Sequence, residues 1–199
     1  FNMVKNKSLM LVSFSAMGLN GSQMCLNTYL VLFVYEKFGI SLVLSGILFV
    51  ISEVSGTLGR IAWGMISDFL FKGNRIVILL IITVLTAFSS LTVALMSSAT
   101  FWLLVPIFIV FGFSVSGFNG IWMNLASEIV PPQQAGISSG VSITFGSIGV
   151  MLVPPIFGLM VDQTGSFTFG WLFISGLMVL VFFMLSYLAI INKKESKMG

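Results

Sequence analysis

The sequence predicts an all-α membrane protein built as a bundle of six transmembrane helices. Of its 199 residues, 57% are hydrophobic and only 8% are charged, whereas about 25% of the residues in a soluble domain are charged. Apolar runs of about 20 residues recur along the chain, and this is the length that crosses a bilayer as a helix. An outer-membrane barrel would show short segments of alternating hydrophobicity instead.

The composition also excludes several functional classes. The sequence has no histidine and a single cysteine, Cys25, so it offers no histidine relay, disulfide framework or metal site. The net charge of +3 comes from basic residues at the chain ends and in one loop, which is typical of membrane topology and not of nucleic-acid binding. We find no nucleophile–base pair and no phosphate-binding loop, and we therefore expect neither an enzyme nor a bound cofactor.

The first helix is expected over residues 8–36, after a polar linker at 1–7. Four polar residues fall on one face of this helix: Ser13, Asn20, Gln23 and Asn27. Lipid offers amides no partner, so this stripe faces other helices or a cavity. Two interpretations stay open. The stripe supplies hydrogen bonds between helices, or its three amides line a cavity and bind a substrate.

The second helix, expected over 41–70, carries two charges near its middle. Counted from Asp68 at about 1.5 Å per residue, Arg60 lies about 12 Å deep and Glu53 about 22 Å deep in a hydrocarbon core of about 30 Å. A charge at this depth faces a protein interior or a water-filled path. Arg60 stays protonated, so it pairs with Glu53, binds a substrate anion while Glu53 carries a coupling proton, or pairs with a part of the protein outside this chain.

The third helix, expected over 75–96, has no charge at its centre and should face lipid over much of its circumference. The fourth is expected over 100–129, with Asn119 and Trp122 as further candidate substrate contacts. Three small residues form a ridge on it that allows close approach of another helix: Gly112, Ser116 and Gly120.

The fifth helix, expected over 136–160, contains Pro154 and Pro155, which free backbone carbonyls and kink a helix. The kink either serves packing or provides a gating bend. A polar turn follows, and the sixth helix is expected over 167–191. The chain then closes with a basic tail at 193–199.

The distribution of basic residues predicts the orientation. If the N-terminus is cytoplasmic, Lys37 alone lies on the outer side, and seven basic residues gather on the inner side: Lys5, Lys7, Lys72, Arg75, Lys193, Lys194 and Lys197. Short cytoplasmic loops are rich in Lys and Arg. We therefore expect both chain ends in the cytoplasm of a multi-pass protein of the plasma membrane.

The turn after the second helix resembles the loop signature of the major facilitator superfamily. That signature is a glycine, three residues and an aspartate, followed by a basic turn, and it corresponds here to Gly64, Asp68 and the segment 72–75. In this sequence Phe69 replaces the basic residue that usually follows the aspartate, as in the second copy of the signature in these transporters. Together with Glu128 and the glycines and prolines of the fifth helix, the resemblance covers nearly the whole chain.

This resemblance implies the C-terminal half of a twelve-helix transporter, whose N-terminal half lies on the same polypeptide or on a separate chain. It implies a secondary transporter that moves a small solute by alternating access, with Arg60 in the position of the substrate arginine of monocarboxylate and oxalate/formate porters. A conformational latch is expected at the cytoplasmic side: Gly64, Asp68, Lys72, Arg75 and Glu128. The alternatives are efflux of lipophilic compounds and a six-helix scaffold without transport.

Overall fold

The computed structural model describes the backbone of residues 5–195 and the side chains of residues 5–193. Within these residues, six helical segments are long and apolar enough to cross a membrane, which confirms the predicted fold class. Residues 196–199 of the predicted tail, Lys197 among them, lie outside the described residues. The elements are α1 (Lys7–Phe38), α2 (Leu42–Leu70), α3 (Arg75–Leu95), α4 (Phe101–Val115), α5 (Asn119–Glu128), a short 3₁₀ turn (Pro132–Gln134), α6 (Ala135–Thr164) and α7 (Phe167–Glu195).

The fourth membrane segment differs from the single helix expected over 100–129, because it is interrupted between α4 and α5. The backbone ladder of α4 ends with the Ser116 N–H on the Gly112 carbonyl, and the Trp122 N–H on the Phe118 carbonyl opens that of α5. Pro106 lies inside α4, so proline is not the cause of the interruption. Its residues, Ser116 to Phe118, are buried.

Local signals set most helix ends. The side chains of Asn6, Ser41 and Asn74 each accept a backbone N–H three residues ahead, and thereby cap α1, α2 and α3. Gly39 and Gly165 adopt left-handed conformations with φ of 65° and 63° at the ends of α1 and α6, as helix C-termini commonly do. α1 and α6 therefore run a few residues past the expected limits, and α6 continues through Pro154 and Pro155.

Two pairs of helices approach each other closely through small residues. α2 packs on α4, where a Cβ at Gly112 would overlap the Ser52 carbonyl and one at Gly56 would overlap Ser116. α1 packs on α6, where a Cβ at Gly149 would overlap the Met17 carbonyl. The predicted ridge on the fourth segment is thus correct for Gly112 and Ser116. It is wrong for Gly120 within the described chain, because Gly120 is exposed and a Cβ there would meet only the Arg60 carbonyl, at 3.9 Å, among these residues.

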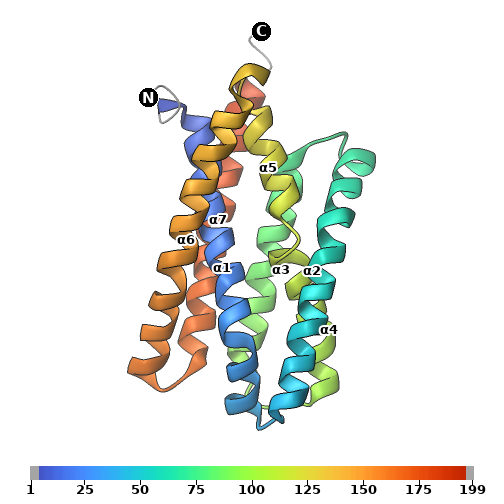
Figure 1. Ribbon diagram of the computed structural model, residues 1–199, viewed down its shortest axis with the longest axis vertical. Helices are drawn as coiled ribbons and strands as arrows, with labels where there is room; N and C mark the ends of the chain where they lie inside the picture. Colours follow the sequence, from blue (N-terminus) through green and yellow to red (C-terminus); the bar gives the residue numbers. More distant parts are fainter. Residues whose placement is uncertain (1–4, 196–199) are drawn as a thin grey trace.

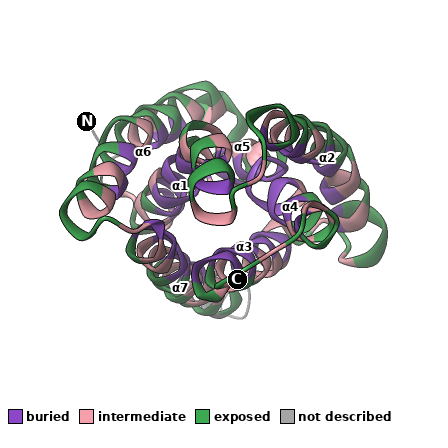
Figure 2. Ribbon diagram, turned by 90° about the horizontal axis from the view of Figure 1, so that it is seen from below, coloured by how far each residue is buried: buried purple, intermediate pink, exposed green. Residues whose placement is uncertain are grey.

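The start of α1, the α2–α3 turn, the start of α6 and the C-terminal end of α7 lie at the same end of the bundle (Figure 1). We call this the basic end, because it holds Lys5, Lys7, Lys72, Arg75 and Lys193. Seen along the bundle in Figure 2, α2 and α6 form its flanks and carry much exposed surface, while α3 and α7 lie together on one side.

Two apolar clusters form the core, one toward each end of the bundle. The cluster toward the basic end includes Val12, Trp63 and Trp122, and the other cluster includes Phe33, Phe108 and Trp171. α1 contributes to both, with Gln23 between its two contributions. Polar side chains from α1 and α2 and from the α4–α5 interruption meet near this level.

Candidate functional site

Six residues near the middle of the bundle form one hydrogen-bonded polar cluster, which we call the central cluster: Gln23, Asn27, Glu53, Arg60, Ser116 and Asn119. They come from α1, from α2, from the segment between α4 and α5, and from the first residue of α5. Only Ser116 is fully buried, Arg60 is exposed, and the other four are half-buried. Polar groups at this depth require protein or water partners, because lipid supplies none.

Glu53 is held by two neutral donors. The Ser116 hydroxyl donates to Glu53 Oε1 at 3.2 Å. The Asn27 amide is oriented so that its nitrogen and oxygen both find complementary partners, and its nitrogen then donates to the same Oε1 at 3.0 Å and to the Gln23 carbonyl at 3.2 Å. The Glu53 side chain therefore links α2 to α1 and to the α4–α5 interruption.

Arg60 binds the backbone of the interruption. Its Nε donates to the Ser116 carbonyl at 3.1 Å. Among the side chains of residues 5–193, no carboxylate lies within 4.0 Å of the Arg60 guanidinium. The direct Arg60–Glu53 ion pair, one of the three interpretations that the sequence left open, is thus not formed.

The remaining sequence candidates have different surroundings. Asn119 donates to Gln23 Oε1 at 3.2 Å and so joins α5 to α1. Asn20 donates to the Ala16 carbonyl of its own helix at 2.9 Å. Trp122 is only 6% exposed, and its N–H donates to the Ser142 hydroxyl at 2.8 Å. The structure thus brings Gln23, Asn27 and Asn119 into the central cluster and places Trp122 in the apolar core beside it.

Ser116 is the member of the central cluster that the sequence indicated only as a packing residue. Its carbonyl accepts hydrogen bonds from side chains because the helix is interrupted directly after it. Two further α2 side chains donate to carbonyls of α4: Ser55 to Ile109 at 2.5 Å and Trp63 to Phe113 at 2.9 Å. The Ser116–Gly117 pair is a local signal of this interruption, because sharp breaks in helices often occur at Gly/Ser pairs.

The basic end carries a second charged group. Arg75 Nη1 donates to Asp68 Oδ1 at 2.5 Å and to the Ser67 hydroxyl at 2.9 Å, and Arg75 Nε lies 3.5 Å from Glu128 Oε1. These contacts join the end of α2, the start of α3 and the end of α5.

Two residues of the predicted latch lie outside this group of contacts. Lys72 is exposed and occupies the turn with a φ of 52°. A Cβ at Gly64 would meet nothing within 4 Å, so Gly64 is not a point of close helix approach within the described chain.

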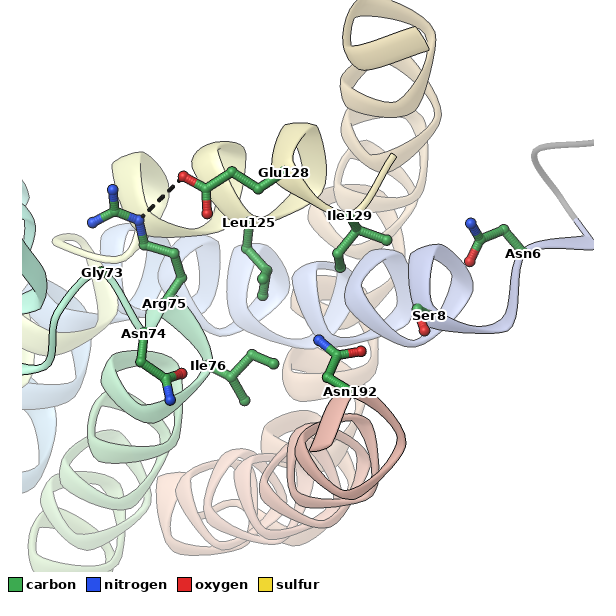
Figure 3. Close-up of a pocket in the computed structure, with 10 residues that line it drawn as sticks. All are labelled: Asn6, Ser8, Gly73, Asn74, Arg75, Ile76, Leu125, Glu128, Ile129 and Asn192. Carbon is green, nitrogen blue, oxygen red and sulfur yellow. Dashed lines mark hydrogen bonds and ion pairs between the residues drawn. The ribbon is translucent and has the colours of Figure 1, made fainter. Parts of the chain in front are cut away.

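A polar pocket of about 420 Å³ opens beside these charges. In Figure 3, Arg75 and Glu128 line one side of it, while the α1 cap Asn6, Ser8 of α1 and Asn192 of α7 lie on the other. The central cluster does not line this pocket. Because Arg60 lies exposed near the middle of a helix, we assign the candidate binding surface to the central cluster and not to this pocket.

A sequence model of the Major Facilitator Superfamily matches residues 12–198. The chain is 28% identical over 170 residues to the probable galactarate/D-glucarate transporter GudP of Bacillus subtilis, covering 83% of this chain and 36% of that protein. It is 24% identical over 183 residues to the probable galactarate/D-glucarate transporter GarP of Escherichia coli, covering 90% and 41%.

A further relative is monocarboxylate transporter 10 of Rattus norvegicus, which is 28% identical over 121 residues, covering 61% of this chain and 23% of that protein. These relatives are transporters and not enzymes. The matched part of the chain spans less than half the length of each of them.

Proposed function

The chain belongs to the major facilitator superfamily, and from this premise we propose that it forms the C-terminal six-helix half of a secondary transporter for a small organic anion. Transport proceeds by alternating access, with the substrate held near the midplane between two halves. The second half is an N-terminal bundle, on the same polypeptide or a separate chain. The basic end faces the cytoplasm of a plasma-membrane protein, in accord with the excess of Lys and Arg there.

One observation carries the proposal: Arg60 is an exposed cation near the middle of a membrane helix, and a backbone carbonyl is its partner. An arginine stays charged at any depth, and an unpaired charge there is costly. A substrate carboxylate supplies the missing negative charge, and its oxygens accept hydrogen bonds from Nη1 and Nη2 of Arg60. The names of the relatives, which refer to galactarate, D-glucarate and monocarboxylates, support a carboxylate substrate.

The neighbours of Arg60 suggest the rest of the site. Gln23, Asn27 and Asn119 present amides that can donate to and accept from substrate hydroxyls, which favours a hydroxylated acid over an apolar one. Glu53 is the candidate for the coupling proton. Asn20 and Trp122 bond to the Ala16 carbonyl and to Ser142 and not to the central cluster. The group Asp68, Arg75 and Glu128 acts as the latch at the basic end, with Gly64 and Lys72 nearby in sequence.

The test is the thermal stability of the purified protein with D-glucarate, L-lactate and inorganic anions, in the wild type and in Arg60→Gln. A ligand at 100 times its Kd adds about 2.7 kcal/mol to the stability of the native state. Carboxylates should raise the melting temperature of the wild type and leave that of Arg60→Gln unchanged.

Thr57→Ala is the matched control, because Thr57 lies one turn away from Arg60, is exposed and donates only within its own helix. It should respond to carboxylates as the wild type does. If no carboxylate stabilises the wild type and Arg60→Gln merely lowers the baseline melting temperature, Arg60 is structural and the proposed function is wrong.

A further inference from the structure

Glu53 and Arg60 are bound to different atoms of the same residue. The Ser116 hydroxyl donates to Glu53 Oε1 at 3.2 Å, and the Ser116 carbonyl accepts from Arg60 Nε at 3.1 Å. The two charges are opposite and lie on one face of α2, yet they have no direct contact within 4.0 Å. Ser116, a neutral residue of another membrane segment, therefore forms hydrogen bonds with both the anion and the cation.

The position of Ser116 is fixed by its surroundings. It is fully buried, and the approach of α2 is so close that a Cβ on Gly56 would overlap the Ser116 Cβ. Because the α4 ladder ends at Ser116, its carbonyl is available to Arg60. Asn119 Nδ2 lies 3.5 Å from the same carbonyl and joins this group to Gln23. The position of Ser116 is thus fixed by contacts on several sides. The side chains of Glu53 and Arg60 are longer, and their charged groups can change position by rotation.

A direct ion pair is the competing arrangement. Residues seven apart on a helix are separated by about 10.5 Å of rise, which an extended glutamate and an extended arginine can span. In a membrane interior, the attraction between opposite charges is much stronger than in water. Formation of that pair would neutralise Arg60 and remove its affinity for a substrate carboxylate.

We propose that Ser116 is a positioning residue that keeps Arg60 available to the substrate by holding Glu53 and Arg60 apart. Its hydroxyl retains Glu53, and its carbonyl fixes the Nε edge of Arg60 so that the Nη1 and Nη2 groups remain for the carboxylate. This inference rests on the proposed anion site. It adds the residue that prevents Glu53 from occupying that site by pairing with Arg60.

Ser116→Ala tests the proposal, because it removes the hydroxyl and leaves the carbonyl in place. The affinity of the full-length protein for D-glucarate is measured by calorimetry in the wild type, Ser116→Ala, Glu53→Gln and the double variant. Without the hydroxyl, Glu53 keeps only the Asn27 amide as a neutral donor within the described chain. Its carboxylate can then pair with Arg60, and binding should weaken about tenfold. Gln at position 53 carries no charge to pair with Arg60, so the double variant should bind within about twofold of Glu53→Gln.

The four measurements separate the explanations. Recovery of affinity in the double variant supports the proposal, since a packing defect at position 116 would persist whatever occupies position 53. The proposal is overturned if Ser116→Ala binds as the wild type does, or if it weakens binding equally in both backgrounds. A fifth measurement, on Arg60→Gln, tests the proposed function separately: if Arg60→Gln binds D-glucarate as the wild type does, the proposed function itself is wrong.

Discussion

Arg75, at the first turn of α3, donates from Nη1 to Asp68 Oδ1 at 2.5 Å and so closes the turn between α2 and α3. Its second contact, from Nε to Glu128 Oε1, is longer at 3.5 Å. The Arg75 side chain is 14% exposed, while the two carboxylate side chains are 58% and 51% exposed. Arg75 is thus the least exposed member of the group, and water weakens its attraction to the two exposed carboxylates.

We expect Asp68→Asn to destabilise the protein more than Glu128→Gln. Exposed ion pairs contribute about 0–1 kcal/mol, and the short Asp68 contact should lie at the upper limit of that range. The free energy of unfolding in a denaturant series measures both variants. If the two variants lose the same free energy of unfolding, the shorter contact with Asp68 is no stronger than the longer contact with Glu128.

Gly149→Ala should destabilise the bundle, because the new Cβ would overlap the Met17 carbonyl where α6 packs on α1. Overpacking of this kind costs about 1–3 kcal/mol. Gly140→Ala on the same helix is the control, since a Cβ there meets nothing within 4 Å, and it should be neutral or stabilising by up to about 1 kcal/mol. The melting temperatures of the two variants should therefore change in opposite directions or by clearly different amounts.

Lys37→Met should loosen the end of the bundle opposite the basic end. Lys37 Nζ donates to the Ala94 and Val93 carbonyls at 3.0 and 3.4 Å, and to the Thr168 hydroxyl at 3.3 Å. A cation at the C-terminal end of a helix is favourable by about 0.3–2 kcal/mol, so the variant should lose stability in this range. Thr168→Val removes one of the three contacts and should cost less, as thermal unfolding would show.

Gln23→Leu should reduce the affinity for D-glucarate more than the affinity for L-lactate. A site that hydrogen-bonds substrate hydroxyls discriminates strongly when a polar group is missing, and D-glucarate carries more hydroxyls than L-lactate does. We expect a loss of about tenfold for D-glucarate, measured by calorimetry. Met24→Leu, an exposed neighbour on α1, is the control. Equal losses for both acids would place Gln23 outside the hydroxyl-binding part of the site.

The candidate site could be predicted from the sequence as a set of residues but not as a set of contacts. Glu53 and Arg60 are conspicuous because charges are rare in apolar helices, and the amides of α1 share one face. Their partners depend on which helices lie side by side. Asn27 meets Glu53 across 26 positions of sequence, and Ser116 meets it across 63.

The sequence by itself determined the number of membrane helices and most of their ends, because hydrophobicity over about 20 residues and capping residues are local properties of the chain. It also determined which end is basic. The tertiary structure decided what no local pattern contains. It decided that the fourth segment breaks at Ser116, that Trp122 is buried against Ser142, and that Arg75 and not Lys72 pairs with Asp68. The contacts of Ser116 with α2 depend on close approach between helices, which the small residue Gly56 allows. The pairings of Trp122 and Arg75 depend on which side chains the fold brings within reach of each other.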